Sequence, residues 1–384
     1  MSKKSFFVCD QPHKDDIVVT YLVTTSLNCE EASIKLCKEQ SLSNALGDDE
    51  EVIKKYSAKY IPDSVRHVNE TQFKVDVAYP AENCENSIAM VLSAAGGDTY
   101  NIKNLYPIKI LDIKLPPTFV GNYFGPTFGV EGLREDLGIY NRPILVGPVK
   151  PCVGMGPKAF AKRAFEALLG GTDIVKDDEL ICSPSYSPLI QRVQAVSRSV
   201  KEAEQKTGEK KMYFAFIGSG SPKEIMAQAG IAKLNGANGF MISPAINGLE
   251  IISDLTDFGL PVIAHNALWY AGHTKDHGIV FSVFALFQRL CGADIVITPA
   301  PYGTFDVMSG AEHLENISAV SRDMDQIERS FPAFCGGQSV HTIPLLRRDV
   351  GSTDFIIVAG TSLYDHPDGP GAGAKLLRES FLSL

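Results

Sequence analysis

The stretch PILVGPVKPCVGMGPKAFAKRAFEALLGGTDIVKDDE, residues 143–179, contains one complete strand–helix–strand unit. Each end is a short apolar run that finishes in polar residues, as buried strands of a parallel sheet do. Between these runs, residues 157–171 repeat apolar side chains at helical spacing and place Phe160, Ala164 and Leu168 on one face. A strand, a helix and a second strand in this order form the repeating unit of α/β proteins with a parallel sheet.

The same rhythm continues toward the end of the chain. Further apolar runs follow, each ending in small or polar residues and each separated from the next by a helical pattern. Eight such units over roughly 240 residues match the size of a (β/α)₈ barrel, and an open doubly wound sheet rarely runs to eight even units. We therefore expect a barrel rather than an open sheet. The eight runs are 143–151, 173–179, 212–220, 239–245, 260–267, 294–301, 331–337 and 354–361.

The first part of the chain has a different organisation. Residues 16–130 mix strand-like runs with helical pieces that need not alternate strictly, which is an α+β pattern. We expect an N-terminal α+β domain of ferredoxin-like type over residues 1–130. Residues 131–384 are then expected to form the (β/α)₈ TIM barrel that carries the catalytic site, so the overall class is α/β.

Charge and composition exclude several kinds of partner. The 384 residues carry a net charge of −9, whereas a nucleic-acid-binding protein needs a basic face. No apolar run approaches the roughly 18 residues of a membrane-spanning helix. The eight cysteines are scattered without a C-x-x-C pair. This distribution is typical of free cysteines that serve as small buried hydrophobic residues in a reducing compartment. We expect a cytoplasmic protein that binds neither nucleic acid nor membrane.

Charged residues at the end of the second barrel run suggest a metal site. In (β/α)₈ barrels the active site lies at the C-terminal ends of the strands, where Asp178 and Glu179 would offer the oxygen ligands that Mg²⁺ prefers. Lys176 lies two residues before Asp178, so both side chains point the same way in an extended strand. A cationic lysine would be repelled by a metal, so it contributes only if it is neutral or carries CO₂ as a carbamate. The alternative is an internal Lys–Asp salt bridge.

Other strand ends could complete an active site. Lys150 would act as a base if burial or a metal lowered its pKa, although it could equally be a surface lysine. His265 is a candidate acid or base, with a buried structural histidine as the alternative. Backbone N–H groups after the seventh and eighth strands commonly bind a phosphate in such barrels. The residues at those turns are Gly336, Gly337, Gly360 and Thr361.

Four segments together resemble the RuBisCO superfamily. They are GPTFGVEGLREDLGIYNRPILVGPVKPCVG (125–154), GGTDIVKDDE (170–179), AHNALWYAGHTKDHG (264–278) and HPDGPGAGAKLLRE (366–379). The resemblance implies that Lys176 is carbamylated by CO₂ and binds Mg²⁺ together with Asp178 and Glu179. It implies that Lys150 removes a proton next to the substrate carbonyl and that His265 is an active-site histidine.

The same resemblance implies a single phosphate site and a partner subunit. The phosphate would be held by the glycine turns already named. Glu39 and Asn101 would reach into the barrel of a neighbouring subunit, so the expected assembly is a homodimer or an assembly of dimers.

The chain departs from the carboxylases of this family at several positions. Carboxylases of this family have a lysine where this chain has Cys152 and an arginine where it has Asn266. They also have a histidine near the position of Ile297 and a serine at the position of Cys335. They also carry a lysine on the loop after the sixth strand, whereas residues 299–321 contain neither Lys nor Arg. Without that cation nothing on the loop would stabilise a developing carboxylate. The chain therefore resembles a RuBisCO-like protein that does not fix CO₂ and whose substrate has one phosphate.

The expected function is a Mg²⁺-dependent lyase or isomerase that forms an enediolate from a phosphorylated ketose or keto-acid sugar. Isomerisation and decarboxylation both pass through an enediolate, and both stay open. One alternative is the 2,3-diketo-5-methylthiopentyl-1-phosphate enolase of methionine salvage, which resembles this chain less because its base lysine aligns with Asn101. The other alternative is a catalytically silent protein that binds sugar phosphates.

Overall fold

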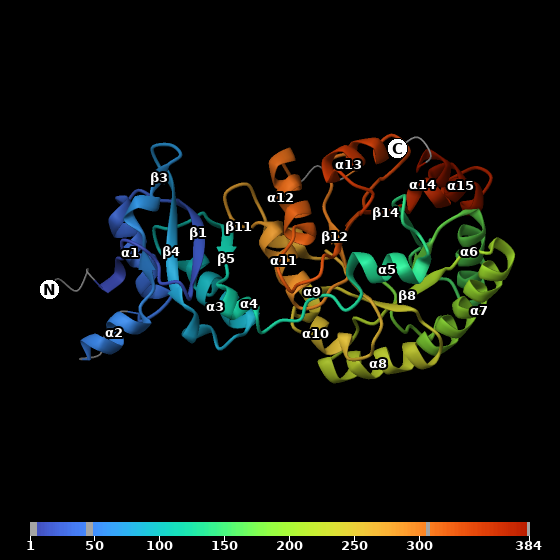
Figure 1. The fold of residues 1–384 in the computed structure, drawn as a ribbon, viewed down its shortest axis with the longest axis horizontal. Helices are drawn as coiled ribbons and strands as arrows, with labels where there is room; N and C mark the ends of the chain where they lie inside the picture. Colours follow the sequence, from blue (N-terminus) through green and yellow to red (C-terminus); the bar gives the residue numbers. More distant parts are fainter. Residues whose placement is uncertain (1–5, 44–48, 305–307, 382–384) are drawn as a thin grey trace. The chain divides into compact units, whose positions relative to one another are not determined.

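The computed structural model describes residues 6–43, 49–304 and 308–381. The chain divides into two compact units (Figure 1). One comprises the chain up to Tyr123 together with Trp269–Phe287, and the other comprises Phe124–Leu268 and the chain from Gln288 onward. The segment Trp269–Phe287 thus groups with the first unit although it lies within the range expected for the barrel. The division into domains at residue 130 stays a prediction.

The first unit is built on a six-stranded sheet with the order β11-β5-β1-β4-β2, and β3 pairs with β4. The strands are β1 (Asp16–Thr24), β2 (Lys59–Tyr60), β3 (Arg66–His67), β4 (Gln72–Pro80), β5 (Ile108–Lys114) and β11 (Gly278–Ile279). Strand β1 is antiparallel to both β4 and β5, and β11 is parallel to β5. The order β5-β1-β4-β2 is that of a ferredoxin-like β-α-β-β-α-β fold, as expected.

Helices α1 (Cys29–Glu39), α2 (Glu50–Tyr56) and α3 (Ile88–Gly96) pack on this sheet. The short helix α4 (Pro117–Val120) follows β5. Strand β1 alternates buried and partly exposed residues over most of its length, as a strand with one covered face should. The buried hydroxyl of Tyr21 on β1 donates a hydrogen bond to the carbonyl of Ala95 in α3, at 2.7 Å. This contact attaches α3 to the middle of the sheet.

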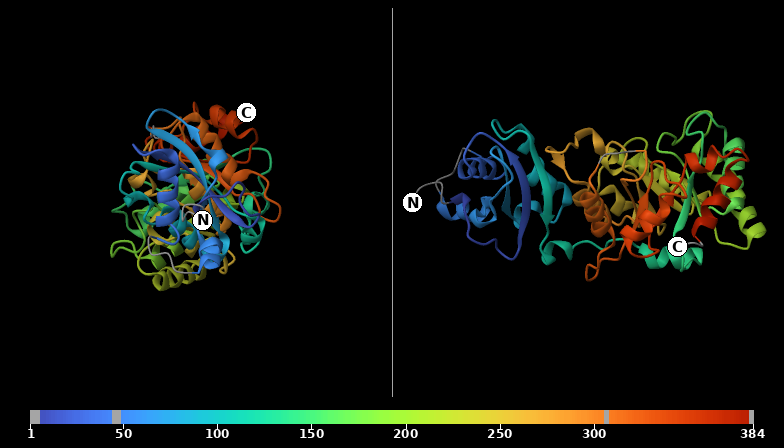
Figure 2. Two further views of the ribbon diagram at one scale, coloured as in Figure 1. Left: turned by 90° about the vertical axis from the view of Figure 1, so that its left-hand side faces the viewer. Right: turned by 90° about the horizontal axis from the view of Figure 1, so that it is seen from above.

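The second unit contains a closed barrel of eight parallel strands, which confirms the expected fold (Figures 1 and 2). Each strand pairs with the next in sequence, and β14 closes the barrel onto β6. All eight expected runs contain a barrel strand. The strands are β6 (Ile144–Pro148), β7 (Ile174–Lys176), β8 (Met212–Phe216), β9 (Gly239–Ile242), β10 (Val262–Ala264), β12 (Ile295–Thr298), β13 (Phe331–Phe334) and β14 (Ile356–Val358).

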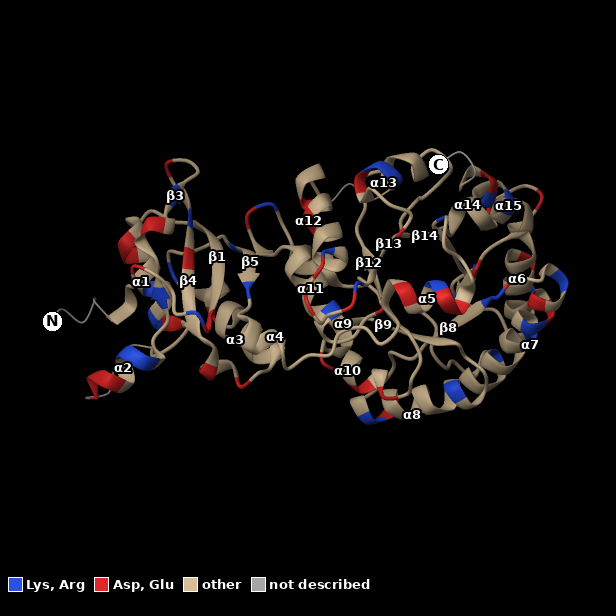
Figure 3. Cartoon of the chain, viewed as in Figure 1, with Lys and Arg blue, Asp and Glu red and all other residues tan. Residues whose placement is uncertain are grey.

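Helices follow the strands and lie outside them, as α6, α7 and α8 show in Figure 1. They are α6 (Pro157–Gly170), α7 (Leu189–Thr207), α8 (Pro222–Leu234), α9 (Pro244–Asn247), α10 (Ile251–Thr256), α12 (Gly310–Ser321), α13 (Ile343–Val350), α14 (Thr361–Tyr364) and α15 (Pro370–Ser380). Helix α11 (Phe281–Leu290) belongs to the first unit up to Phe287. Charges of both signs are interspersed along α8 and along α5, which comprises Gly129–Leu137 (Figure 3). No helix in the described parts of the chain is long and apolar enough to cross a membrane.

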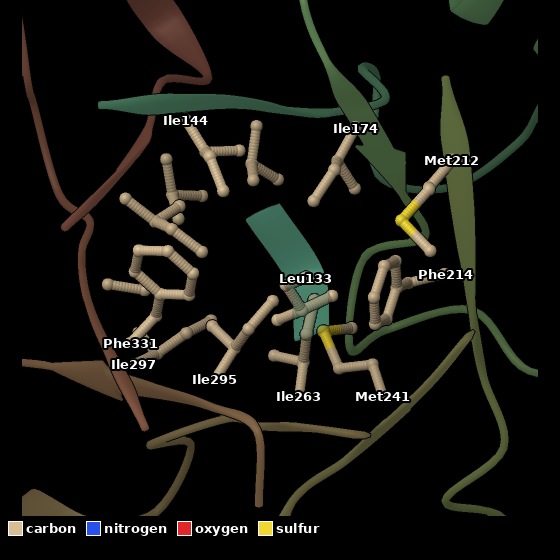
Figure 4. Close-up of a cluster of buried hydrophobic side chains, with 14 of the residues drawn as sticks. Leu133, Ile144, Ile174, Met212, Phe214, Met241, Ile263, Ile295, Ile297 and Phe331 are labelled. Carbon is tan, nitrogen blue, oxygen red and sulfur yellow. The ribbon is translucent and has the colours of Figure 1, made fainter. Parts of the chain in front are cut away.

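Helix α5 (Gly129–Leu137) contributes to the packing inside the barrel. Its Leu133 lies in a cluster with Ile144, Ile174 and Phe331 from the barrel strands (Figure 4). The first amides of a helix lack partners within the helix. Here the buried carboxylate of Asp294, next to β12, accepts from Phe128 N and Gly129 N at 2.8 and 2.9 Å. The side chains of α5 therefore help to fill the barrel interior.

Strand alternation explains which residues reach the barrel mouth. Side chains two positions apart on a strand face the same way, so residues that follow the inward apolar positions line the interior at the C-terminal end. On β7, Ile174 in the apolar cluster is followed on the same face by Lys176 and then Asp178. On β10, Ile263 is followed by His265 in the same way. The apolar core thus supports a polar layer directly above it.

Candidate active site

Lys176 ends strand β7, and Asp178 follows two residues later, both in a buried environment. Lys176 is 2% exposed and Asp178 is 3% exposed. The side-chain nitrogen of Lys176 donates a hydrogen bond to the carbonyl of Asp177 at 3.0 Å. Burial lowers the pKa of Lys176, and the nearby carboxylates of Glu179 and Asp178 only partly oppose this shift. The environment therefore favours the neutral amine at Lys176, the form that can add CO₂.

Lys150 lies directly beside this pair. Its ammonium nitrogen is 2.6 Å from Oδ2 of Asp178 and 2.9 Å from Sγ of Cys152. Burial alone would lower the pKa of Lys150, but the hydrogen bonds to Asp178 and Cys152 outweigh it and raise the pKa. The same contact has the opposite effect on the carboxyl group. Burial alone would raise the pKa of Asp178, but the nearby Lys150 and Lys176 hold that pKa below its ordinary value. The pKa of Lys150 is therefore raised rather than lowered as expected for a base, because Asp178 is its ion-pair partner.

Glu179 and His265 form a second pair at the same mouth. His265 Nε2 lies 3.3 Å from Oε2 of Glu179, and His265 Nδ1 accepts a hydrogen bond from Ala267 N at 3.1 Å. Because Nδ1 is an acceptor, Nε2 carries the proton and points at the carboxylate. Burial, reinforced by Lys176, lowers the pKa of His265 to about 3. The imidazole is therefore neutral and offers an N–H donor at Nε2.

Asp177, the middle residue of the charged run, does not take part in this group. It is fully buried and accepts from Arg192 on α7, from the hydroxyl of Tyr213 at 2.7 Å and from Phe216 N at 3.0 Å. Sequence reasoning missed both side chains that bind it. A signal was present, since Arg192 falls in the apolar stripe of α7 with Leu189 and Val196, where a buried charge requires a partner.

The glycine turns lie after the seventh and eighth barrel strands, where a phosphate site was predicted. Gly336 and Gly337 follow β13 with φ of +81° and +82°, and Gly336 O accepts from Thr304 N at 2.8 Å. Gly360 follows β14 and adjoins the site, since a Cβ built there would lie 3.4 Å from Cε of Lys150. Thr361, the first residue of α14, is exposed. The phosphate-binding role of these residues stays a prediction.

Cys335 at the end of β13 belongs to the same polar group. Burial raises the pKa of its thiol to about 11, and Lys176 and Glu179 act on it electrostatically. It replaces the serine of the carboxylases without adding a charge. Glu39, at the end of α1, and Asn101 lie in the first unit. Their predicted contact with a neighbouring subunit stays a prediction.

The donor set at β7 fits a hard divalent cation if Lys176 is carbamylated. Within residues 6–43, 49–304 and 308–381, no three His, Cys, Asp or Glu side chains come together in a group that could hold a metal ion. Asp178 and Glu179 supply carboxylate oxygens, and burial lowers the pKa of Lys176 beside them, which shifts it toward the neutral amine. A carbamate on that amine would add a third anionic oxygen donor, which is the ligand type that Mg²⁺ prefers.

The family of the chain follows from comparison with known proteins. Residues 129–383 match the catalytic domain of the ribulose bisphosphate carboxylase large chain, and residues 9–119 match its N-terminal domain. A ribulose bisphosphate carboxylase-like protein of Chlorobaculum tepidum is 31% identical over 387 residues, covering 96% of this chain and 88% of the relative. A 3-oxo-isoapionate-4-phosphate decarboxylase of Rhizobium rhizogenes is 30% identical, covering 95% of this chain and 92% of the relative.

Solved structures agree with this assignment. The octameric ribulose-1,5-bisphosphate carboxylase/oxygenase of Pyrococcus horikoshii has a TM-score of 0.92 at 29% identity, covering 99% of this chain and 91% of that one. The dimeric archaeal Rubisco of Hyperthermus butylicus has a TM-score of 0.90 at 27% identity, covering 99% and 93%. The chain, with both large-chain domains and this arrangement of lysines and carboxylates at the barrel mouth, belongs to the RuBisCO superfamily.

Proposed function

We propose that this chain is a Mg²⁺-dependent enzyme that forms an enediolate from a phosphorylated ketose or keto-acid sugar and does not fix CO₂. The observation that carries the proposal is the buried side chain of Lys176, whose pKa is lowered by burial, near the carboxylates of Asp178 and Glu179. Lys150 contacts Asp178 at the same place. A relative named as a sugar-phosphate decarboxylase supports the decarboxylating form of this chemistry.

Lys176, Asp178 and Glu179 would hold the metal ion. In its neutral form the amine of Lys176 would attack the carbon of CO₂. A C–N bond forms, one C–O π bond of CO₂ breaks and its electron pair moves to oxygen, and nitrogen releases one proton, which leaves an anionic carbamate. Burial favours this reaction because it disfavours the competing ammonium form. When bound, Mg²⁺ would act as a Lewis acid that polarises the substrate carbonyl and stabilises the negative charge of the enediolate.

Lys150 would remove the proton from the carbon next to the substrate carbonyl. A lysine must be neutral to accept a proton, and the hydrogen bond to Asp178 keeps the pKa of Lys150 high. Loss of that hydrogen bond removes the main cause of the raised pKa. Burial then favours the neutral amine, which is the form of a general base.

His265 would donate a hydrogen bond rather than act as a base. Its Nδ1 already accepts from Ala267 N, and its Nε2–H faces the mouth of the barrel at Glu179. A neutral imidazole can stabilise a developing oxyanion by hydrogen bonding without carrying a charge. Cys152, Asn266 and Ile297 are uncharged and stand where the carboxylases have cationic groups. Without those cations a second phosphate would have no binding partner, which supports a substrate with a single phosphate.

We further propose that the phosphate binds at Gly336, Gly337, Gly360 and Thr361. Gly360 lies beside Lys150, so a phosphate there would place the rest of the substrate across the polar layer. We also propose a homodimer or an assembly of dimers in which Glu39 and Asn101 reach a neighbouring barrel. Related structures that are named as dimeric and octameric support this assembly.

Hydrogen–deuterium exchange at the substrate α carbon tests the function. 3-Oxo-isoapionate 4-phosphate and 2,3-diketo-5-methylthiopentyl 1-phosphate are incubated in D₂O with protein, Mg²⁺ and bicarbonate, and exchange and CO₂ release are followed by NMR. We expect exchange or decarboxylation of one substrate, loss of the reaction in Lys150→Ala and no change in Lys158→Ala, an exposed lysine on α6. If neither compound is the substrate, calorimetry with Mg²⁺ and bicarbonate still measures whether the protein binds the metal. A protein without metal affinity would contradict the proposal.

A further inference from the structure

The guanidinium of Arg192 binds residues that precede and follow Asp178 and Glu179, the two carboxylates proposed to hold the metal. Its Nε and Nη2 donate to the carboxylate of Asp177, with the closest contact at 2.9 Å from Nη2. Nη2 also donates to the carbonyl of Cys182, and Nη1 donates to the carbonyl of Ser187 at 2.8 Å. Asp177 directly precedes Asp178, and Cys182 lies three residues after Glu179. One side chain therefore ties down the segment that carries both carboxylates.

This arrangement requires an arginine. Arg192 and Asp177 are both fully buried, so neither charge is compensated by water. Arginine offers five N–H donors in a planar fork, whereas lysine offers a single charged point. A lysine at this position could pair with Asp177 but could not also reach the two carbonyls in the same geometry. The hydroxyl of Tyr213, at 2.7 Å from Oδ1, holds the other side of the same carboxylate.

We propose that Arg192 and Tyr213 are positioning residues for the metal site. They act through Asp177, which faces away from the barrel mouth, and they fix the backbone from which Lys176, Asp178 and Glu179 face the mouth. Partners of this kind, one step removed from a metal ligand, typically change metal affinity by about 10–100-fold when they are lost. The inference rests on the proposed metal site.

The same strand provides a matched control at its other end. Asp173, just before β7, is 1% exposed and is bound by Arg142 at 2.8 Å and by Arg378 at 3.0 Å. This cluster lies at the N-terminal end of the strand, away from the mouth. Arg142→Lys therefore disturbs a buried arginine–carboxylate pair on β7 without touching the segment that carries the carboxylates. It separates a general loss of stability from a loss of positioning.

The experiment measures metal and carbamate binding without any substrate. Full-length wild type, Arg192→Lys, Tyr213→Phe and Arg142→Lys are titrated with Mn²⁺ in bicarbonate and followed by electron paramagnetic resonance. The carbamate is followed by ¹³C NMR with ¹³C-bicarbonate, at a temperature where each protein is folded. We expect Mn²⁺ affinity to fall about tenfold or more in Arg192→Lys. We expect a smaller fall in Tyr213→Phe and no fall in Arg142→Lys.

The outcomes distinguish this inference from the proposed function. If wild type binds neither Mn²⁺ nor CO₂, the proposed metal site fails and the inference fails with it. If wild type binds both and Arg192→Lys binds them equally well, Arg192 has only a structural role. If Arg192→Lys does not fold, Tyr213→Phe decides the question, because it removes a single hydroxyl. Unchanged Mn²⁺ affinity in that variant overturns the inference.

Discussion

The ammonium of Lys150 lies 2.6 Å from Oδ2 of Asp178, so the candidate base and a candidate metal ligand neutralise each other. The side chain of Asp178 is 4% exposed, and that of Lys150 is 32% exposed. A divalent cation that takes Asp178 as a ligand competes with Lys150 for the same carboxylate, and it meets the positive charge of Lys150 at short range. Metal binding and release of the base are therefore linked through one contact.

Replacing Lys150 should separate metal binding from catalysis. In Lys150→Met the proton acceptor is lost, so exchange at the substrate α carbon should fall to background. Mn²⁺ should bind several-fold more tightly, because no cation competes for Asp178. Both quantities are measured on the same preparation, with Lys158→Met as a control for removal of an exposed lysine. Loss of both the exchange reaction and Mn²⁺ binding in Lys150→Met would show that Lys150 mainly supports the local structure.

The pairing of Asp177 predicts a large loss of stability on its removal. Asp177→Asn leaves the fully buried Arg192 without a countercharge, and breaking a buried pair in this way costs about 3–5 kcal/mol. Urea denaturation at neutral pH measures the change in the free energy of unfolding. The control is Glu202→Gln, whose exposed pair with Lys206 on α7 should contribute at most about 1 kcal/mol. Equal effects in the two variants would contradict the role of burial.

The two glycine turns should respond differently to alanine. Gly337 has φ of +82°, and a Cβ there would lie 2.7 Å from Cγ2 of Thr304, so Gly337→Ala should lose about 1–3 kcal/mol. Gly360 has an ordinary φ of −92°, and its nearest neighbour, Cε of Lys150, lies 3.4 Å away. Gly360→Ala should therefore keep its stability and raise KM for the phosphorylated substrate. A large loss of stability in Gly360→Ala would show that the turn is tighter than these contacts indicate.

The extent to which sequence predicted this protein depends on how local each signal is. The barrel strands were predictable because each is buried on both faces and reads as an apolar run. Strand alternation then places Lys176 and Asp178 on one face. The pairing of Asp177 with Arg192 spans 15 residues and depends on how α7 packs against the strands. Only the position of Arg192 in an apolar stripe hinted at it.

Other features had no local signal. Strand β11 contains only Gly278 and Ile279, too few residues for any periodicity, yet it joins the segment Trp269–Phe287 to the sheet of the first unit. The raised pKa of Lys150 likewise depends on a contact with Asp178, 28 residues away. Sequence predicted which side chains meet at the mouth but not which charges pair there before a metal binds.

A buried histidine away from the site predicts a loss of stability in mild acid. His313 on α12 is 1% exposed, and burial lowers its pKa although the nearby carboxylate of Asp349 opposes the shift. His313 Nε2 lies 3.4 Å from Oδ2 of Asp349, which also pairs with Arg348 and accepts from Tyr302. The rings of Tyr302 and Phe334 pack against the imidazole. His313 is therefore neutral in the folded protein near neutral pH.

The sign of the pH effect follows from this lowered pKa. A histidine in the unfolded chain titrates near pH 6.5. Below that pH the unfolded chain binds a proton that folded His313 does not, so the free energy of unfolding decreases as the pH is lowered. His313→Gln should remove this contribution. Its free energy of unfolding should therefore lie further below wild type at pH 7.5 than at pH 5.5. Urea titrations at the two pH values test this, with His13→Gln, an exposed histidine, as the control. A gap that stays constant between the two pH values would mean that His313 has the same pKa in the folded and unfolded chains.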